Sequence, residues 1–252
     1  MKRDTVGYRS WKRKLDLIFG LGTMLLAGLI FFLTLSPGVF PGQSAALMAT
    51  FTGIEPPVAP SHPIWGAIVA WIGGLSPSAM ALNLNIFSAL CGTACIGLLY
   101  LLMTRLVYQN LDHDHGERAG NHVVAAVMAA AVSAVALTFC VPFWMASTRL
   151  HFQVFDLLLL LLMAHLCLAF TKQFNMWLGL LFALLYGVCI VESVSFTAFA
   201  PIFIIYIFYV AYRQEKLQFW RFFLLGLFAV AGLAFFLLVA DNFCRLGDLS
   251  LR

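Results

Sequence analysis

The sequence predicts an all-helical membrane protein with about seven transmembrane helices, and three observations lead to this fold class. Of its 252 residues, 62% are hydrophobic and 10% are charged, whereas a soluble domain has roughly 45–50% apolar and about 25% charged residues. The mean hydropathy of +0.94 is that of a chain whose main solvent is lipid. Apolar runs long enough to cross a bilayer recur along the whole chain. We therefore expect one transmembrane domain over residues 1–252.

The first span follows a basic tail. Residues 1–16 carry six Lys or Arg, and an apolar run over 17–35 comes next. A cleaved signal peptide has a shorter apolar stretch that ends in small residues at the cleavage site. The segment Leu35-Ser36-Pro37-Gly38 offers no such site. We expect an uncleaved first helix with a cytoplasmic tail.

The connection between the first two spans, residues 36–78, is long and holds seven of the nine prolines. We expect an organised outer loop with two short helices, over 43–51 and 63–75. Proline at position 63 suits the first turn of a helix, and Trp65 and Trp71 suit a membrane interface. Loops of this length in compact proteins are commonly functional.

Six later apolar segments have the length and composition of spanning helices. They cover 79–104, 122–142, 150–171, 175–192, 196–212 and 219–240. Short polar connections separate them, and residues 241–252 form a final tail. Seven spans place the two ends of the chain on opposite sides of the membrane.

The distribution of Lys and Arg predicts the orientation, because cytoplasmic loops carry an excess of these residues. With the N-terminus inside, twelve of the 15 Lys and Arg lie inside and only Arg149, Arg245 and Arg252 lie outside. We expect a cytoplasmic N-terminus and an outer C-terminus. The basic residues are spread along the chain among apolar runs, so nucleic-acid binding is not expected.

Cysteine and histidine patterns do not indicate a metal site. Cys91 and Cys95 share a helical face without a His or acid at ligand spacing, and small hydrophobic cores use Cys freely. The tract Asp112-His113-Asp114-His115 lies in a short polar loop, where solvated side chains are expected. We expect no cofactor and leave a divalent cation open.

Ionisable residues near the expected outer face are the candidates for function, since such groups within membrane spans are often functional. They include Glu55, His62, Arg149, His151, Asp156 and Glu192. Two arrangements remain open: an outward-facing polar chamber roofed by the 36–78 loop, or interface charges that snorkel and pair with one another.

Three stretches carry a resemblance to a known family. They are Thr34-Leu35-Ser36-Pro37 with the following Gln43-Ser44-Ala45-Ala46-Leu47, Pro60-Ser61-His62-Pro63-Ile64-Trp65, and Asn85-Ile86-Phe87-Ser88-Ala89-Leu90. Together with the order of basic tail, span, long outer loop and many spans, they resemble the GT-C class of membrane glycosyltransferases. Within that class the chain is similar to the protein O-mannosyltransferase-like family.

The sequence departs from the family pattern at the loop acids. Family members read D-S-G-E after the first span, where this chain has Gln43 at the Asp position and Ala46 at the Glu position. In the family's H-P-P-G-[YF]-P stretch, Val58 takes the His place and His62 the aromatic place. Glu192-Ser193 stands where the family has a His-His pair.

The resemblance implies transfer of a sugar from a polyprenyl phosphate to a hydroxyl of a protein or glycan acceptor, on the outer face of a bacterial inner membrane. Such a reaction needs a carboxylate as base and a cation for the departing phosphate. Glu55 is the first candidate base, with Glu192 and Asp156 next. Arg149 is the phosphate candidate, because a guanidinium fits a phosphate bidentately. His62, His151 and Gln43 are the candidate substrate-binding residues.

Two other functions stay open at this point, and enzymatic activity is not assigned. The missing loop acid favours a non-catalytic lipid-binding or assembly subunit on the same scaffold. A transporter is the third alternative, although the chain lacks an inverted repeat and a pair of matching broken helices.

Overall fold

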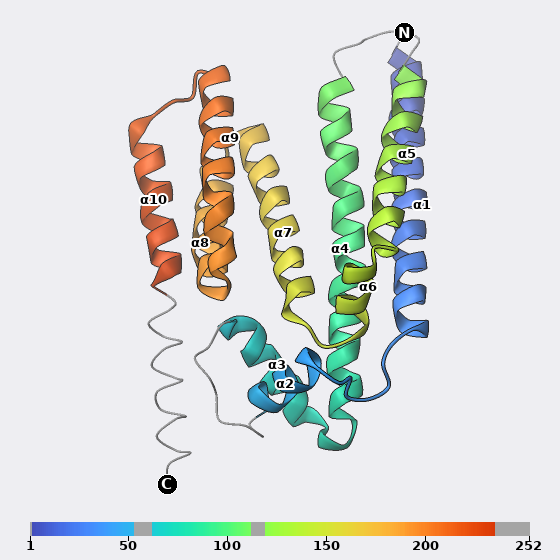
Figure 1. The fold of residues 1–252 in the computed structure, drawn as a ribbon. Helices are drawn as coiled ribbons and strands as arrows, with labels where there is room; N and C mark the ends of the chain where they lie inside the picture. The colour runs from blue at the N-terminus through green and yellow to red at the C-terminus, as the bar shows by residue number, and fades with distance from the viewer. Residues whose placement is uncertain (1, 53–61, 112–118, 235–252) are drawn as a thin grey trace. The chain divides into compact units, whose positions relative to one another are not determined.

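The computed structural model describes residues 2–52, 62–111 and 119–234, and every regular element in these ranges is a helix (Figure 1). In chain order they are α1 (Lys2–Leu33), α2 (Gln43–Phe51), α3 (Pro63–Leu75), η1 (Pro77–Ala79), α4 (Met80–Leu111), α5 (Ala119–Thr138), α6 (Val141–Thr148), α7 (Phe152–Gln173), α8 (Met176–Glu192), η2 (Val194–Phe199), α9 (Ala200–Arg213) and α10 (Phe219–Leu233). The all-helical class is therefore confirmed.

The structure supports four to five membrane spans by length and composition. Four segments qualify on their own: Lys14–Leu33, Met80–Tyr108, Phe152–Lys172 and Val194–Arg213. A fifth span results if the bent pair His122–Thr138 and Val141–Thr148 counts as one. The count of seven stays a prediction, because α8 and α10 have only 17 and 15 residues, fewer than the roughly 20 that a spanning helix needs.

The predicted span over 122–142 is two helices that meet at 66°. Pro142 lies in the first turn of α6, where a missing N–H costs nothing. The apolar composition of the segment did not indicate the bend. The last predicted span, 219–240, begins as α10, but its final residues lie outside the described part of the chain.

Helices α2 and α3 run over the two ranges expected within the long connection. Pro63 starts α3, which agrees with its predicted role. Trp65 is fully buried and Trp71 is 67% exposed, so only Trp71 is available to a membrane interface.

The chain forms two compact units. Unit 1 contains residues 1–44 and 81–161, and unit 2 contains residues 45–80 and 162–252. The division falls inside α7, so that its first turns belong to unit 1 and its last turns to unit 2.

In unit 1, α1 packs on α5 and α6. The Tyr108 hydroxyl of α4 donates to Asp16 Oδ1 of α1 at 2.6 Å. Just after the last residue of α1, the Trp144 indole N–H of α6 donates to Thr34 Oγ1 at 2.9 Å. These two bonds connect the segment of α1 to α4 and to α6. Leu25 and Leu33 on α1 expose 71% and 76% of their surface, as expected for a helix that faces lipid.

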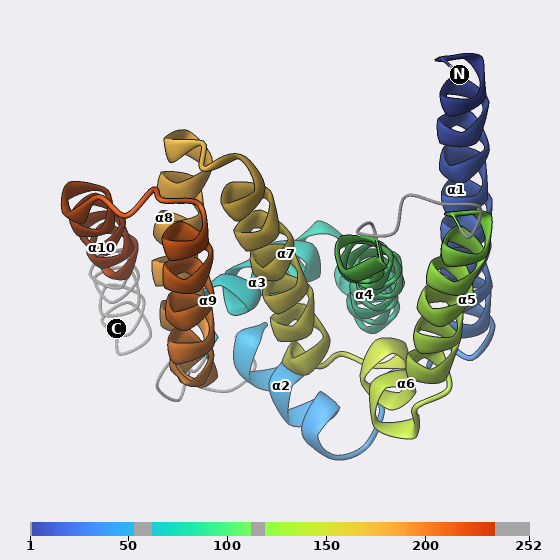
Figure 2. The ribbon, with the colours of Figure 1, turned by 90° about the horizontal axis from the view of Figure 1, so that it is seen from above.

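In unit 2, α10 lies along α8, as both views show (Figures 1 and 2). Their backbones touch where Gly187 meets Gly232, and a Cβ on either glycine would collide with a carbonyl oxygen of the other helix. Small residues allow this close approach between membrane helices. Phe203 of α9 packs edge-on against Phe182 and Tyr186 of α8.

Candidate functional site

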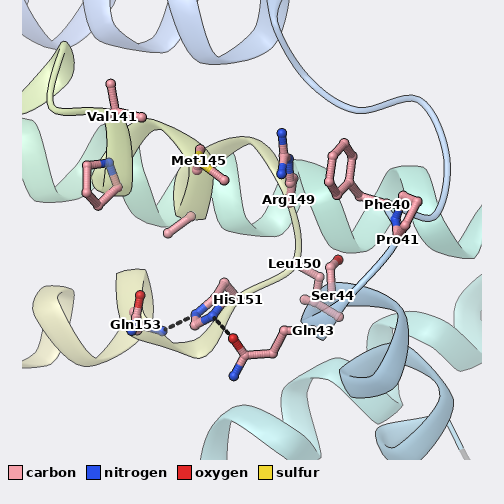
Figure 3. A pocket seen from close by; sticks show the side chains of 12 residues that line it. Phe40, Pro41, Gln43, Ser44, Val141, Met145, Arg149, Leu150, His151 and Gln153 are labelled. Carbon is pink, nitrogen blue, oxygen red and sulfur yellow. Dashed lines mark hydrogen bonds between the residues drawn. The ribbon is translucent and has the colours of Figure 1, made fainter.

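Unit 1 contains a pocket of about 460 Å³ beside the start of α7 (Figure 3). Its wall comes from the loop before α2, the first residues of α2, helix α6, the connection from α6 to α7 and the first turn of α7. The lining residues are Phe40, Pro41, Gln43, Ser44, Val141, Pro142, Met145, Ala146, Arg149, Leu150, His151 and Gln153. The pocket is therefore built from two chain segments about a hundred residues apart.

A fully buried asparagine on α4 joins these two segments. Asn85 Nδ2 donates to the carbonyl oxygens of Ser36 at 2.8 Å and Gly38 at 3.1 Å. Its Oδ1 accepts from the backbone N–H of Leu150 at 2.9 Å. A direct backbone bond from the Ser36 N–H to the Thr148 carbonyl, at 3.2 Å, adds to this link. Asn85 thus holds the two walls of the pocket in register.

Arg149 lies against an aromatic ring in the pocket. Its guanidinium carbon is 3.3 Å from the centroid of the Phe40 ring, which is a close cation–π contact. The lining residues that the structure describes include no carboxylate, so none of them neutralises the charge of Arg149. The planar group remains suited to an anion with oxygen acceptors.

His151 is held in one neutral tautomer by two contacts, drawn as dashed lines in Figure 3. The backbone N–H of Gln153 donates to His151 Nδ1 at 3.2 Å, so Nδ1 bears the lone pair. The proton then lies on Nε2, which donates to Gln43 Oε1 at 3.1 Å. Desolvation lowers the pKa of His151 below its usual 6.5, which also favours the neutral ring. His151 therefore orients the Gln43 amide and has no free lone pair to act as a base.

Ser44 contributes a buried hydroxyl to the same wall. The residue is 6% exposed, and its Oγ has no hydrogen-bond partner among the described residues. A buried polar group without a partner costs free energy. A ligand in the pocket could supply the missing bond.

The pocket brings together three of the predicted substrate-binding residues, Arg149, His151 and Gln43. Neither Asp156 nor Glu192 is among its described lining residues. Asp156 lies on α7, three residues after Gln153, with its Oδ1 buried. Glu55 lies outside the described residues.

Glu192 and His62 meet in unit 2, at the first turn of α3. The Glu192 carboxylate is 1% exposed and accepts from the backbone N–H groups of Ile64 at 2.6 Å and Trp65 at 3.1 Å. A negative charge is favourable at a helix N-terminus, where such N–H groups have no intrahelical partner. His62 Nδ1 lies 3.3 Å from the Glu192 carbonyl oxygen. This carboxylate thus caps α3 and ties it to α8.

No group of three His, Cys, Asp or Glu in the described residues could hold a metal ion. The tract Asp112-His113-Asp114-His115 lies outside those residues. Cys91 and Cys95 are buried free cysteines.

Reasoning from the sequence missed three residues of the site. Phe40 and Ser44 carry no signal of their own, because only the fold shows that they face Arg149 and the pocket. Asn85 does carry a signal, since a polar amide inside the apolar run over 79–104 must find partners within the protein.

The comparisons agree with this membrane architecture. Residues 44–218 match the family model described as "Protein O-mannosyl-transferase TMEM260 N-terminal domain". No curated protein and no solved structure matches the chain. The family match covers more than half of the 252 residues, it agrees with the family resemblance drawn from the sequence, and it indicates a glycosyltransferase-related role. The chain belongs to the TMEM260 N-terminal family of protein O-mannosyl-transferases.

Proposed function

We propose that the unit 1 pocket binds the phosphate of a polyprenyl-phosphate-linked sugar, and that the chain transfers this sugar to a hydroxyl of a protein or glycan acceptor. The observation that carries the proposal is the position of Arg149 in a pocket that has no carboxylate among its described lining residues. The Phe40 ring supports the guanidinium from one face at 3.3 Å. Its N–H donors, which lie in the plane of the group, remain suited to phosphate oxygens.

Arg149 would stabilise the charge that develops on the phosphate as the bond to the sugar breaks. Gln43, oriented by His151 at 3.1 Å, and the buried Ser44 hydroxyl would contact polar atoms of the phosphate or the sugar. A carboxylate must remove the proton of the acceptor hydroxyl. Glu55 is the proposed base, on sequence grounds, and Asp156 of unit 1 is the alternative.

The proposed orientation places the N-terminus in the cytoplasm and the pocket on the outer face of a bacterial inner membrane. The charge bias of the sequence supports it. Within unit 1, Asp16 and Tyr108 meet near the start of the first candidate span and the end of the second, which this orientation places toward the cytoplasm. Ser36 and Thr148 pair at the other end, beside the pocket.

A direct test measures the affinity of the purified chain for a polyprenyl-phosphate mannose. Arg149→Ala should weaken binding roughly 10- to 100-fold, since hydrogen bonds to charged groups contribute about 1.5–3 kcal/mol. Arg149→Lys keeps the charge but not the planar donors, so it should recover only part of the affinity. Lys14→Ala, on the exposed side of α1, serves as the control. Unchanged affinity in Arg149→Ala would contradict the phosphate site.

Sugar transfer tests the base separately from binding. Glu55→Gln should abolish transfer to an acceptor while donor affinity stays, because the amide cannot accept the proton. Asp156→Asn is the matched variant for the alternative base. Full transfer in both variants would exclude the two carboxylates from the chemistry.

A second function is favoured by the state of Glu192. Its carboxylate is engaged with two N–H groups of α3, and the unit 1 pocket has no acid among the lining residues within the described ranges. These two observations favour a lipid-binding or assembly subunit that binds the donor without transferring its sugar. Binding of the donor with no transfer by the wild-type chain, in the presence of acceptor, would favour this role.

A further inference from the structure

One end of unit 2 gathers basic side chains from three connected helix ends. The C-terminal ends of α7 and α9 lie beside the N-terminal ends of α8 and α10 (Figure 1). The Gln214 side-chain N–H donates to the Thr171 carbonyl at 3.2 Å, which ties the end of α9 to the end of α7. The cations at this end are Lys172, Arg213, Lys216 and Arg221, and we call them the basic cluster.

A defined turn sets the position of Lys216. The backbone N–H of Lys216 bonds to the Ala211 carbonyl at 3.0 Å, and that of Glu215 bonds to the Tyr212 carbonyl at 3.1 Å. Glu215 has a φ of 54°, so the turn has the geometry of a Schellman motif at the end of α9. It leaves Lys216 Nζ 5.2 Å from the centroid of the Phe174 ring, after the end of α7.

Lys216 and Arg221 line a small hollow together with apolar residues of α7, α8 and α10. The hollow has a volume of about 10 Å³, which is room for about one water molecule. An anionic group would therefore lie across its mouth, against the two cations, rather than inside it. No member of the basic cluster has an ion-pair partner among the described residues.

Aromatic side chains surround the basic cluster and face outward. Trp177 is 81% exposed, Phe219 87% and Trp220 55%. Trp residues of this kind occupy the headgroup level of a membrane, and basic residues at that level attract anionic lipids. Glu215 is the one exposed acid in the turn, so the local charge stays strongly positive.

We propose that the basic cluster binds the headgroup of an anionic phospholipid in the leaflet that this end of unit 2 faces. Lys216 and Arg221 contact the phosphate, Lys172 and Arg213 add to the attraction, and Trp177 and Trp220 lie at the level of the headgroups. The site is a lipid-binding surface separate from the residues that line the unit 1 pocket, and it does not depend on sugar transfer.

The test compares binding of phosphatidylglycerol and phosphatidylcholine with the same acyl chains to the purified full chain, by native mass spectrometry. The wild-type chain should prefer phosphatidylglycerol. Each cation near an anionic surface contributes about 1 kcal/mol, so Lys216→Gln with Arg221→Gln should lower this preference up to about 30-fold. Glu215→Gln should raise it, because a negative charge is removed.

Two controls separate the proposal from other causes. Lys216→Arg with Arg221→Lys keeps both charges and should keep the preference, which excludes a folding defect. Lys14→Gln removes a cation of unit 1 and should also leave the preference for phosphatidylglycerol unchanged. A preference that survives Lys216→Gln with Arg221→Gln would overturn the proposal. Complete competition by inorganic phosphate would overturn it too, since the ligand would then be a soluble anion.

Discussion

The side-chain oxygen of Asn85 accepts a hydrogen bond from the backbone N–H of Leu150, 65 residues further along the chain, at 2.9 Å. Leu150 stands between Arg149 and His151 in the pocket wall. The amide of the same side chain holds Ser36 and Gly38, shortly before the loop reaches Phe40. The buried Asn85 therefore sets the distance between the Arg149 guanidinium and the Phe40 ring.

Asn85→Asp should weaken binding of the polyprenyl-phosphate donor and lower the free energy of unfolding by about 1–3 kcal/mol. The aspartate keeps an acceptor for the Leu150 N–H but turns an oxygen toward two carbonyl groups. Ser88→Ala is the matched control, because Ser88 is a buried residue of α4 whose hydroxyl has no partner among the described residues. Donor affinity and thermal unfolding in detergent measure both effects. Equal donor affinity and equal thermal unfolding in the two variants would show that Asn85 does not position the walls of the pocket.

Glu192→Gln should destabilise the protein by about 1–3 kcal/mol, because an amide has one acceptor oxygen where the carboxylate has two. The backbone N–H groups of Ile64 and Trp65 would compete for this one oxygen, and the NH₂ group of the new side chain would face one of these two donors. Donor binding in the unit 1 pocket should persist. Thermal unfolding and donor affinity check the two halves of this expectation. A stable Glu192→Gln variant that binds donor but fails to transfer sugar would instead give the carboxylate a chemical role.

Gly187→Leu should disrupt the packing of α8 against α10. Even a Cβ at Gly187 would collide with the Ala229 carbonyl oxygen, and overpacking costs about 1–3 kcal/mol. Gly226→Ala on α10 is the matched control, because a Cβ there meets no atom within 4 Å. That change should be neutral or stabilise α10 by up to about 1 kcal/mol, since Ala favours a helix. The unfolding temperature of Gly187→Leu should therefore fall, whereas that of Gly226→Ala should stay or rise. The same shift in both variants would contradict the close contact between α8 and α10.

The stability should fall as the pH drops below about 6.5, partly through His151. Desolvation lowers its pKa in the folded state, so below 6.5 the unfolded chain binds a proton that the folded chain does not. The contribution of the neutral ring is complete above pH 6.5 and is lost as the pH falls toward the folded pKa. His151→Gln removes this titration. Its unfolding temperature, measured from pH 5 to 8, should show a smaller pH dependence than that of the wild-type chain, and an equal dependence would count against the neutral His151.

The sequence predicted local features of the fold better than long-range ones. Both short helices of the 36–78 connection were predicted, and the second was indicated by Pro63, which acts on its own turn. The bend between α5 and α6 was missed, since apolar composition continues through Pro142. The predicted range 175–192 agrees with α8 to within one residue, and the predicted range 219–240 begins where α10 begins.

The same distinction holds for the site. Arg149, His151 and Gln43 were predicted one by one, from charge, position and family resemblance. Their meeting in one pocket depends on Asn85 and on packing that no local pattern contains. The cap that Glu192 makes on α3 joins residues 128 positions apart, so the sequence suggested a catalytic acid where the structure has an engaged carboxylate.

The most direct measurement of the central claim is photo-crosslinking with a polyprenyl phosphate that carries a diazirine next to the phosphate. The labelled peptides of the full chain would be mapped by mass spectrometry, with Arg149→Ala as the comparison. A phosphate site at Arg149 predicts labels on residues 40–44 and 145–153, and a strong reduction of this labelling in Arg149→Ala. Labels confined to other parts of the chain, equal in both proteins, would contradict a phosphate site at Arg149.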